Sequence, residues 1–169
     1  EIVFAGRFIV MKNVASLIEA FAKVRTPYRL VLIGGGPDEH RIRNAAQELR
    51  LSNRMYILPA MEQRALYERI KNSRVLVLPS WTDIAPNEVS EAISLGLPML
   101  VTKENFLPFR EQLPEMIDPS SVDDIARKLE MIADDVRYQE FSEKCRSVQY
   151  DHDWDSVLRE HLAVFKKVL

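Results

Sequence analysis

The sequence predicts an α/β fold, in which a doubly wound parallel sheet of about six strands carries helices on both faces. Short apolar runs alternate with longer segments whose apolar residues recur at helical spacing, from residue 2 to residue 102. Strands that alternate with helices in this way pair in parallel through right-handed crossovers. The chain has 169 residues, of which 47% are hydrophobic, so we expect a single domain with a buried core.

The expected strands are short apolar runs bounded by glycine, proline or polar residues. They are residues 2–6, 28–34, 54–58, 74–79 and 98–102, with a short sixth strand at 115–118. Amphipathic segments between them predict helices. These are residues 13–25, a segment that begins near residue 38, residues 63–73, and a segment from 85 or 86 to 96.

Some of the expected helices carry more detailed predictions. In the second helix Ile42, Ala45, Ala46 and Leu49 would face inward. The fourth would begin at Ala85 or Pro86, because proline suits a first helical turn, and Gly96 would cap its end. The rest of the chain reads as helical. The segment "SSVDDIARKLEMIA" begins with a serine cap, and "WDSVLREHLAVFKKVL" is amphipathic.

Composition and charge narrow the class of protein. The formal net charge is −2, so the chain lacks the basic surplus with which nucleic-acid-binding proteins contact phosphates. Cys145 is the only cysteine and no Cys/His cluster has metal spacing, so we expect neither an internal disulfide nor a metal site. The apolar runs fall well short of the ~18 residues that span a membrane, and no signal peptide is evident. We therefore expect a cytoplasmic location.

Four loops follow expected strands and would meet at one edge of the sheet. They read "GRFIVMKN", "GGGP", "LPAME" and "SWTDIAPN". In doubly wound sheets, ligands bind outside the carboxyl ends of the strands. We therefore expect these loops to build the functional site.

The first two loops suggest a site for an anion. Arg7 and Lys12 flank the turn that leaves the first strand, where an arginine fork and a lysine point charge could clamp a diphosphate. Their spacing alone favours a plainer interpretation, a surface arginine and a lysine at a helix start. Gly34, Gly35 and Gly36 would let the backbone approach a ligand closely, or would form a tight turn. They match neither the dinucleotide-binding pattern nor a Walker loop.

The fourth loop and the helix after it hold three carboxylates, Asp83, Glu88 and Glu91. Asp83 would lie in the loop, whereas the two glutamates, three residues apart, would share one helix face. The helix dipole stabilises acids near a helix start, which accounts for both glutamates without any function. In the functional interpretation, a carboxylate here accepts hydrogen bonds from a pair of sugar hydroxyls.

Histidines and tryptophans add no further site. His40, His152 and His161 lack a Ser or Cys partner at motif spacing, so we expect them at the surface. Trp154 and Trp81 are expected to be packing residues, and Trp81, beside the fourth loop, could also line a pocket.

Taken in this order, the four loops resemble the C-terminal, donor-binding domain of GT-B fold glycosyltransferases, most closely the retaining family 4. The blocks that carry the likeness are "FAGRFIVMKN", "LVLIGGGPDEHRIRNAAQELRLSNRMYILPAM", "LYERIKNSRVLVLPSWTDIAPNEVSEAISLGLPMLVT" and "HDWDSVLREHLAVFKKVL", nearly the whole chain. The third is the most specific, because it resembles the family's E-x7-E element, here Asp83-x7-Glu91. The resemblance implies one Rossmann-like half of a GT-B fold. The apolar start "EIVFAG" fits a fragment that lacks the N-terminal acceptor domain.

The resemblance implies a role for each matching position. Arg7 and Lys12 match the basic pair that holds the donor diphosphate. Asp83 matches the acid at the transferred sugar, and Glu91 matches the acid that binds the ribose hydroxyls. The other donor-binding positions are Gly34, Gly35 and Gly36 near the donor, Leu58 to Met61 beside the nucleobase, and Ile84, Ala85 and Asn87 along the sugar and the diphosphate.

Two features depart from the family pattern. The first acid is Asp83 rather than glutamate, so its carboxylate reaches one methylene less far. The loop reads "IAPN" where many members have a Gly-aromatic-Gly run, and Pro86 has no amide hydrogen to donate. We interpret this loop as the variant of a subgroup.

The resemblance implies a hexosyltransferase-type enzyme of polysaccharide biosynthesis. It would transfer sugar from a nucleotide diphosphate donor, with retention of anomeric configuration and without a cofactor or metal ion. A glycan or lipid-linked acceptor would bind through the missing N-terminal domain, and no nucleic acid would be a partner. The fragment alone would bind donor without turnover, and the full-length protein could associate peripherally with a membrane.

Three alternatives remain open. One is a non-catalytic nucleotide-sugar-binding or regulatory Rossmann-like domain, and another is a GT-B sugar-nucleotide epimerase or phosphorylase. A pyridoxal-type phosphorylase would need a Schiff-base lysine motif, which we do not find. The third is a non-catalytic flavodoxin-like or receiver-like signalling module. A receiver needs an acidic cluster after its first strand and a phosphoryl-accepting aspartate after its third. Here those strands end in "GRF" and "LPAM", which argues against it.

Overall fold

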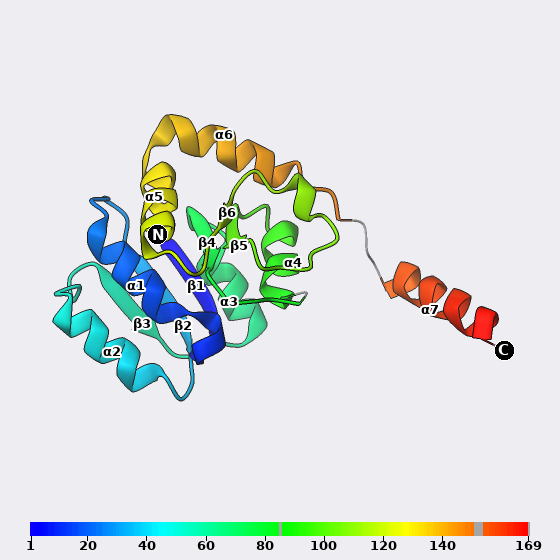
Figure 1. The fold of residues 1–169 in the computed structure, drawn as a ribbon, viewed down its shortest axis with the longest axis horizontal. Helices are drawn as coiled ribbons and strands as arrows, with labels where there is room; N and C mark the ends of the chain where they lie inside the picture. The colour runs from blue at the N-terminus through cyan, green and yellow to red at the C-terminus, as the bar shows by residue number, and fades with distance from the viewer. Residues whose placement is uncertain (85, 151–153, 169) are drawn as a thin grey trace.

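The computed structural model describes residues 1–84, 86–150 and 154–168. It confirms the expected fold class: a six-stranded sheet in the order β3-β2-β1-β4-β5-β6, in which every neighbouring pair is parallel (Figure 1). The strands are β1 Ile2–Arg7, β2 Leu30–Gly35, β3 Met55–Leu58, β4 Val75–Leu78, β5 Met99–Thr102 and β6 Met116–Ile117. All of β4 and β5 is buried, as expected for strands covered on both faces.

Helices cover the sheet in two groups. The helix α1 (Val14–Lys23) lies against α2 (Glu39–Glu48) and α5 (Val122–Ala133). The helices α3 (Gln63–Ile70) and α4 (Asn87–Ser94) are joined by a hydrogen bond from Gln63 to Glu91. The core between these layers includes Phe4, Phe8 and Phe21, all fully buried. The four helices α1, α2, α3 and α4 lie in the segments that the amphipathic pattern predicted to be helical.

The strand order reverses between β1 and β4. From β1 the chain proceeds outward to β2 and β3, and from β4 it proceeds outward on the other side to β5 and β6. A crevice forms outside the carboxyl ends of the two strands at such a switch point, and ligands of open α/β sheets bind there. Arg7 ends β1, and the loops that carry Lys12 and Asp83 leave from β1 and β4.

Two details of the expected helices were wrong. Leu49 was expected to face inward, but it caps the end of α2 and is 39% exposed. The helix α4 begins at Asn87, and Pro86 precedes it as an extended N-cap with φ −65° and ψ 129°. Proline fixes only φ, so the same residue suits the first turn or the residue before it. The expected C-terminal end of this helix was correct, because Gly96 follows α4 with a left-handed φ of 61°.

The C-terminal part is helical, as expected. The helix α5 begins at a serine cap, where Ser121 Oγ accepts a hydrogen bond from the Asp124 amide at 3.1 Å. It is followed by α6 (Asp135–Arg146) and α7 (Trp154–Val168). In Figure 1, α7 stands away from the sheet, and its Leu158 and Phe165 are exposed. Within the described ranges no helix is both long and apolar enough to cross a bilayer.

Candidate functional site

The loop after β1 positions Lys12 through the residue that follows it. Lys12 ends the short 3-10 helix η1 (Val10–Lys12), and Asn13 then adopts a left-handed conformation with φ 51°. The buried Asn13 side chain donates from Nδ2 to the carbonyl oxygens of Pro79 at 3.1 Å and Pro119 at 2.9 Å. These bonds tie the β1 loop to the segments that leave β4 and β6, so the position of Lys12 is fixed by three strands.

Lys12 meets two carboxylates at the switch point. Its Nζ lies 3.2 and 3.3 Å from the two Asp83 carboxylate oxygens and 3.7 Å from Glu88 Oε1. The three side chains are 15%, 14% and 21% exposed, so the cluster is only partly screened by water. The fold thus brings together two residues that are 71 positions apart in sequence.

Backbone hydrogen bonds hold the Asp83 loop from both sides. The Trp81 amide donates to the Met11 carbonyl at 2.9 Å, and the Asp83 amide donates to the Glu104 carbonyl at 3.0 Å. In return the Phe106 amide donates to the Asp83 carbonyl at 3.2 Å. At the carboxyl end of β4, Ser80 Oγ is buried and has no hydrogen-bond partner among the described residues. Backbone hydrogen bonds therefore hold the loop in place, and the Asp83 carboxylate is available to pair with Lys12.

The glycine loop packs closely against the end of β1. A Cβ on Gly34, which has φ +149°, would lie 1.9 Å from the Gly6 carbonyl oxygen. A Cβ on Gly36 would lie 2.4 Å from the Phe8 carbonyl oxygen, which also accepts a hydrogen bond from the Asp38 amide. The tight-turn interpretation therefore accounts for both residues, whatever ligand the loop meets.

A pocket of ≈ 290 Å³ opens between these loops. Its lining combines glycine backbone, apolar side chains from β2, α3 and the β3–α3 loop, one cation and one acid. The lining residues are Ala5, Gly6, Arg7, Ile33, Gly34, Gly35, Ala60, Met61, Leu66 and Glu88. Arg7 is exposed, and its guanidinium makes no ion pair or hydrogen bond with any described residue. The Arg7 guanidinium, which is unpaired among the described residues, therefore lies at the wall of a largely apolar pocket.

Glu91 lies apart from this pocket. It accepts a hydrogen bond from Gln63 Nε2 at 3.1 Å and another from the Tyr67 hydroxyl. Burial, and then the Glu91 carboxylate, raise the pKa of Tyr67. Together with Asn87, these residues line a second cleft between α3 and α4. Glu88 and Glu91 share a helix face, as expected, yet their carboxylates meet different partners.

The remaining expected site residues are dispersed. Ile84 is 79% exposed in the loop before α4, and Ala85 lies outside the described residues. Leu58 ends β3 and is half-buried, whereas Gly36 lines none of the pockets above. Trp81 lines a cleft with Asn13, Ile42 and others.

The histidines do not join the site. His40 is exposed and bonds Asn44, and His161 bonds the Val157 carbonyl of its own helix. His152 lies outside the described residues, as does the side chain of Trp154. Within the described ranges, no three His, Cys, Asp or Glu side chains gather closely enough to hold a metal ion.

Two residues of the site were missed by sequence reasoning. Glu88 was interpreted as a dipole-favoured helix start, but its carboxylate faces Lys12 and the pocket. Asn13 was not singled out, although asparagine is one of the few residues other than glycine that readily adopt the left-handed conformation found there. Its two carbonyl partners come from distant segments, which no local pattern reveals.

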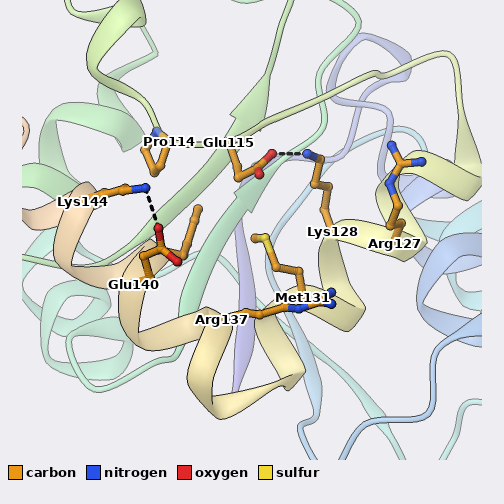
Figure 2. Close-up of a pocket in the computed structure, with 9 residues that line it drawn as sticks. Pro114, Glu115, Arg127, Lys128, Met131, Arg137, Glu140 and Lys144 are labelled. Carbon is orange, nitrogen blue, oxygen red and sulfur yellow. Dashed lines mark hydrogen bonds and ion pairs between the residues drawn. The ribbon is translucent and has the colours of Figure 1, made fainter.

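The larger cleft in Figure 2 lies elsewhere, between α5, α6 and the segment before β6. It has a volume of ≈ 360 Å³ and is lined by cations and acids. Lys128 pairs with Glu115 and Lys144 pairs with Glu140, so much of its positive charge is already neutralised. Pro114 and Glu115 precede β6, so this cleft lies at the amino end of that strand, away from the switch point.

Comparisons with known proteins agree with this architecture. The family model described as "Glycosyl transferases group 1" matches residues 1–148. An uncharacterized glycosyltransferase of Haemophilus influenzae is 24% identical over 149 residues, covering 84% of this chain and 41% of that protein. A lipopolysaccharide 1,6-galactosyltransferase of Salmonella typhimurium is 27% identical over 145 residues, covering 80% of this chain and 40% of that protein.

A solved structure shows the same fold. An Anabaena protein in complex with UDP superposes with a TM-score of 0.79 at 15% identity, covering 99% of this chain and 49% of that one. The chain thus spans less than half the length of these relatives. Because the family model covers most of its length, the chain belongs to the group 1 glycosyl transferases.

Proposed function

We propose that the chain binds a nucleotide diphosphate sugar at the β1–β4 switch point and is the donor half of a retaining glycosyltransferase. The observation that carries the proposal is that Arg7 lines the apolar pocket and Lys12 lies 3.7 Å from Glu88, which lines the same pocket. Family membership supports the reaction class, and the UDP in the Anabaena structure supports the class of donor.

The two cations would neutralise the diphosphate. Arg7 has no other partner among the described residues, and Lys12 is held in place by Asp83 and Glu88. Negative charge grows on the leaving diphosphate as the sugar departs, so cations positioned beforehand would stabilise the transition state. On this proposal no metal ion is needed, and donor binding is expected to be the same in the presence of a chelator.

The other site residues would each contact a different part of the donor. Met61 and the end of β3 at Leu58 would lie beside the nucleobase, and Glu91 would receive ribose hydroxyls. Asp83 would meet the transferred sugar, with the amides of Ile84 and Asn87 along the sugar and the diphosphate. The glycine loop would border the donor through Gly34 and Gly35, which line the pocket.

The acceptor would be a glycan or a lipid-linked saccharide, bound by a domain outside this chain. The Salmonella relative is a lipopolysaccharide galactosyltransferase, which supports an acceptor of this class. Transfer would require both halves, so the 169-residue chain is expected to bind donor without transferring sugar.

Calorimetric titration with UDP, GDP and ADP tests the proposal. We expect one nucleotide to bind, and Arg7→Ala to weaken that binding about 10- to 100-fold, the value of a hydrogen-bonded charge. Arg137→Ala is the matched control, because Arg137 is also an exposed arginine but lies in the cleft of Figure 2. Binding of no nucleotide, or equal loss in both variants, would contradict the proposal.

A further inference from the structure

Glu88 is the acid of the pocket. Among the residues that line the ≈ 290 Å³ pocket it is the one carboxylate. Its Oε1 lies over Gly6, 3.1 Å from where a Cβ on that glycine would be. A side chain on Gly6 would therefore displace this carboxylate from the pocket wall.

The Glu88 carboxylate has hydrogen-bonding capacity to spare. Its closest charged partner is Lys12 Nζ at 3.7 Å, which is too long for a hydrogen bond. Its oxygens accept no hydrogen bond from the described residues. A carboxylate can accept about four hydrogen bonds, so a partly buried one that faces a pocket is ready to receive donors from a ligand.

The pocket walls indicate which part of the ligand these donors belong to. Ile33, Met61 and Leu66 are apolar, and a carboxylate beside them repels phosphate. The phosphates of a nucleotide would instead lie at Arg7 and Lys12. The ribose joins the phosphates to the nucleobase, so an acid that lies between Lys12 and the apolar wall proposed for the base meets the ribose rather than the transferred sugar.

We propose that Glu88 accepts a hydrogen bond from the ribose 2′-hydroxyl, leaving the 3′-hydroxyl to Glu91, and so selects ribonucleotides over 2′-deoxyribonucleotides. This inference rests on the proposed nucleotide-sugar site. Glu91, one turn further along α4, already accepts hydrogen bonds from Gln63 and Tyr67, whereas Glu88 does not share such partners. Glu88 thus adds a second acid to the ribose position, and it is the one with free acceptor capacity.

The test is a cycle of two nucleotides and two proteins. The dissociation constants of UDP and 2′-deoxy-UDP are measured for the unsubstituted chain and for Glu88→Ala. The unsubstituted chain is expected to prefer UDP about 10-fold or more, the value of a hydrogen bond to a charged group. In Glu88→Ala the preference should fall to within about 2-fold, because UDP loses affinity while 2′-deoxy-UDP has no such bond to lose.

Two further variants separate recognition from indirect effects. Removing the charge beside Lys12 changes diphosphate binding equally for both nucleotides, so it cancels in the ratio. Glu88→Gln keeps one acceptor oxygen and should retain part of the preference. Glu130→Ala, on the exposed surface of α5, should leave both constants unchanged.

The outcomes distinguish the two proposals. Absence of binding of UDP, GDP and ADP alike by the unsubstituted chain would contradict the proposed function itself. If GDP or ADP binds instead of UDP, that nucleotide and its 2′-deoxy form replace UDP and 2′-deoxy-UDP in the cycle. UDP binding with no preference over 2′-deoxy-UDP, or a preference that survives in Glu88→Ala, would overturn only the role of Glu88. Circular dichroism of each variant confirms that a lost preference is measured on folded protein.

Discussion

At the scale of single residues, Asn13 matters most for the geometry of the site. It is 6% exposed, and its amide joins the loop of Lys12 to the carbonyl oxygens of Pro79 and Pro119. Asparagine also tolerates the left-handed conformation better than most residues do. Local sequence could indicate the turn, but the two partners are 66 and 106 positions away and depend on the complete fold.

Replacing Asn13 is therefore expected to destabilise the chain and to displace Lys12. Asn13→Gly keeps the backbone conformation but loses both hydrogen bonds, and should cost about 2 kcal/mol of unfolding free energy. Asn13→Ala should cost about 1 kcal/mol more, because alanine is strained at a φ of 51°. Urea unfolding measures both values, and equal stability of Asn13→Gly and the unsubstituted chain would refute the bridging role.

Asp118 gives a residue-scale prediction for pH. Hydrogen bonds from Lys103 and Ser120 lower the pKa of its carboxyl from 3.8 to about 2. The folded state thus favours the ionised form more than the unfolded state does. The resulting stability is complete above pH 3.8 and is lost as the pH falls through about 2.

A carboxyl-detected NMR titration measures this pKa directly. We expect a midpoint near 2 for Asp118 in the unsubstituted chain, and a higher midpoint in Lys103→Ala, because the largest cause of the shift is removed. Thermal midpoints of Asp118→Ala and the unsubstituted chain should differ above pH 4 and converge toward about pH 2. An Asp118 midpoint at 3.8 would show that these hydrogen bonds do not persist in solution.

At the scale of elements, the sequence predicted strands and helices correctly where the spacing of apolar residues determines the type of element. All six strands and the helices between them were predicted because buried parallel strands read as apolar runs and amphipathic helices as a repeating stripe. Element ends were less predictable. Pro86 lies just outside α4 because its fixed φ is compatible with both sides of a helix start.

The sequence also could not predict which partners the Glu88 and Glu91 side chains of α4 would meet. Glu88 and Glu91 are equivalent in any helical plot, because they lie on one face. What separates them is their neighbours: Lys12 and Gly6 approach one carboxylate, whereas Gln63 and Tyr67 approach the other. Those neighbours come from β1, its loop and α3, so only the packed molecule assigns them.

The end of β2 gives a prediction at the element scale. Gly34→Ala would place a Cβ 1.9 Å from the Gly6 carbonyl oxygen at a φ of +149°, and should cost at least about 3 kcal/mol of unfolding free energy. Gly35→Ala is the matched control, because its Cβ would meet only Glu39 Oε2 at 3.7 Å. We expect that variant to stay within about 1 kcal/mol of the unsubstituted chain in urea unfolding. Similar losses in both variants would contradict the close approach of β1 and β2.

At the scale of the whole molecule, the topology explains why the four loops meet. A sheet that reverses its strand order between β1 and β4 opens a crevice at their carboxyl ends, and the alternating pattern predicted that edge. The pocket itself was not predictable. It depends on how closely the glycine backbone approaches β1 and on where Met61 and Leu66 lie, which are distances in the packed fold.

The most direct measurement of the central claim is the location of the bound nucleotide. Backbone amide NMR spectra are recorded as the nucleotide that binds most tightly among UDP, GDP and ADP is added to the labelled chain. We expect the shifts to concentrate around the switch point, at Gly6, Arg7, Lys12, Gly34, Gly35 and Glu88. Shifts concentrated instead at Arg127, Lys128 and Lys144, around the cleft of Figure 2, or no shifts at saturating UDP, GDP or ADP, would contradict it.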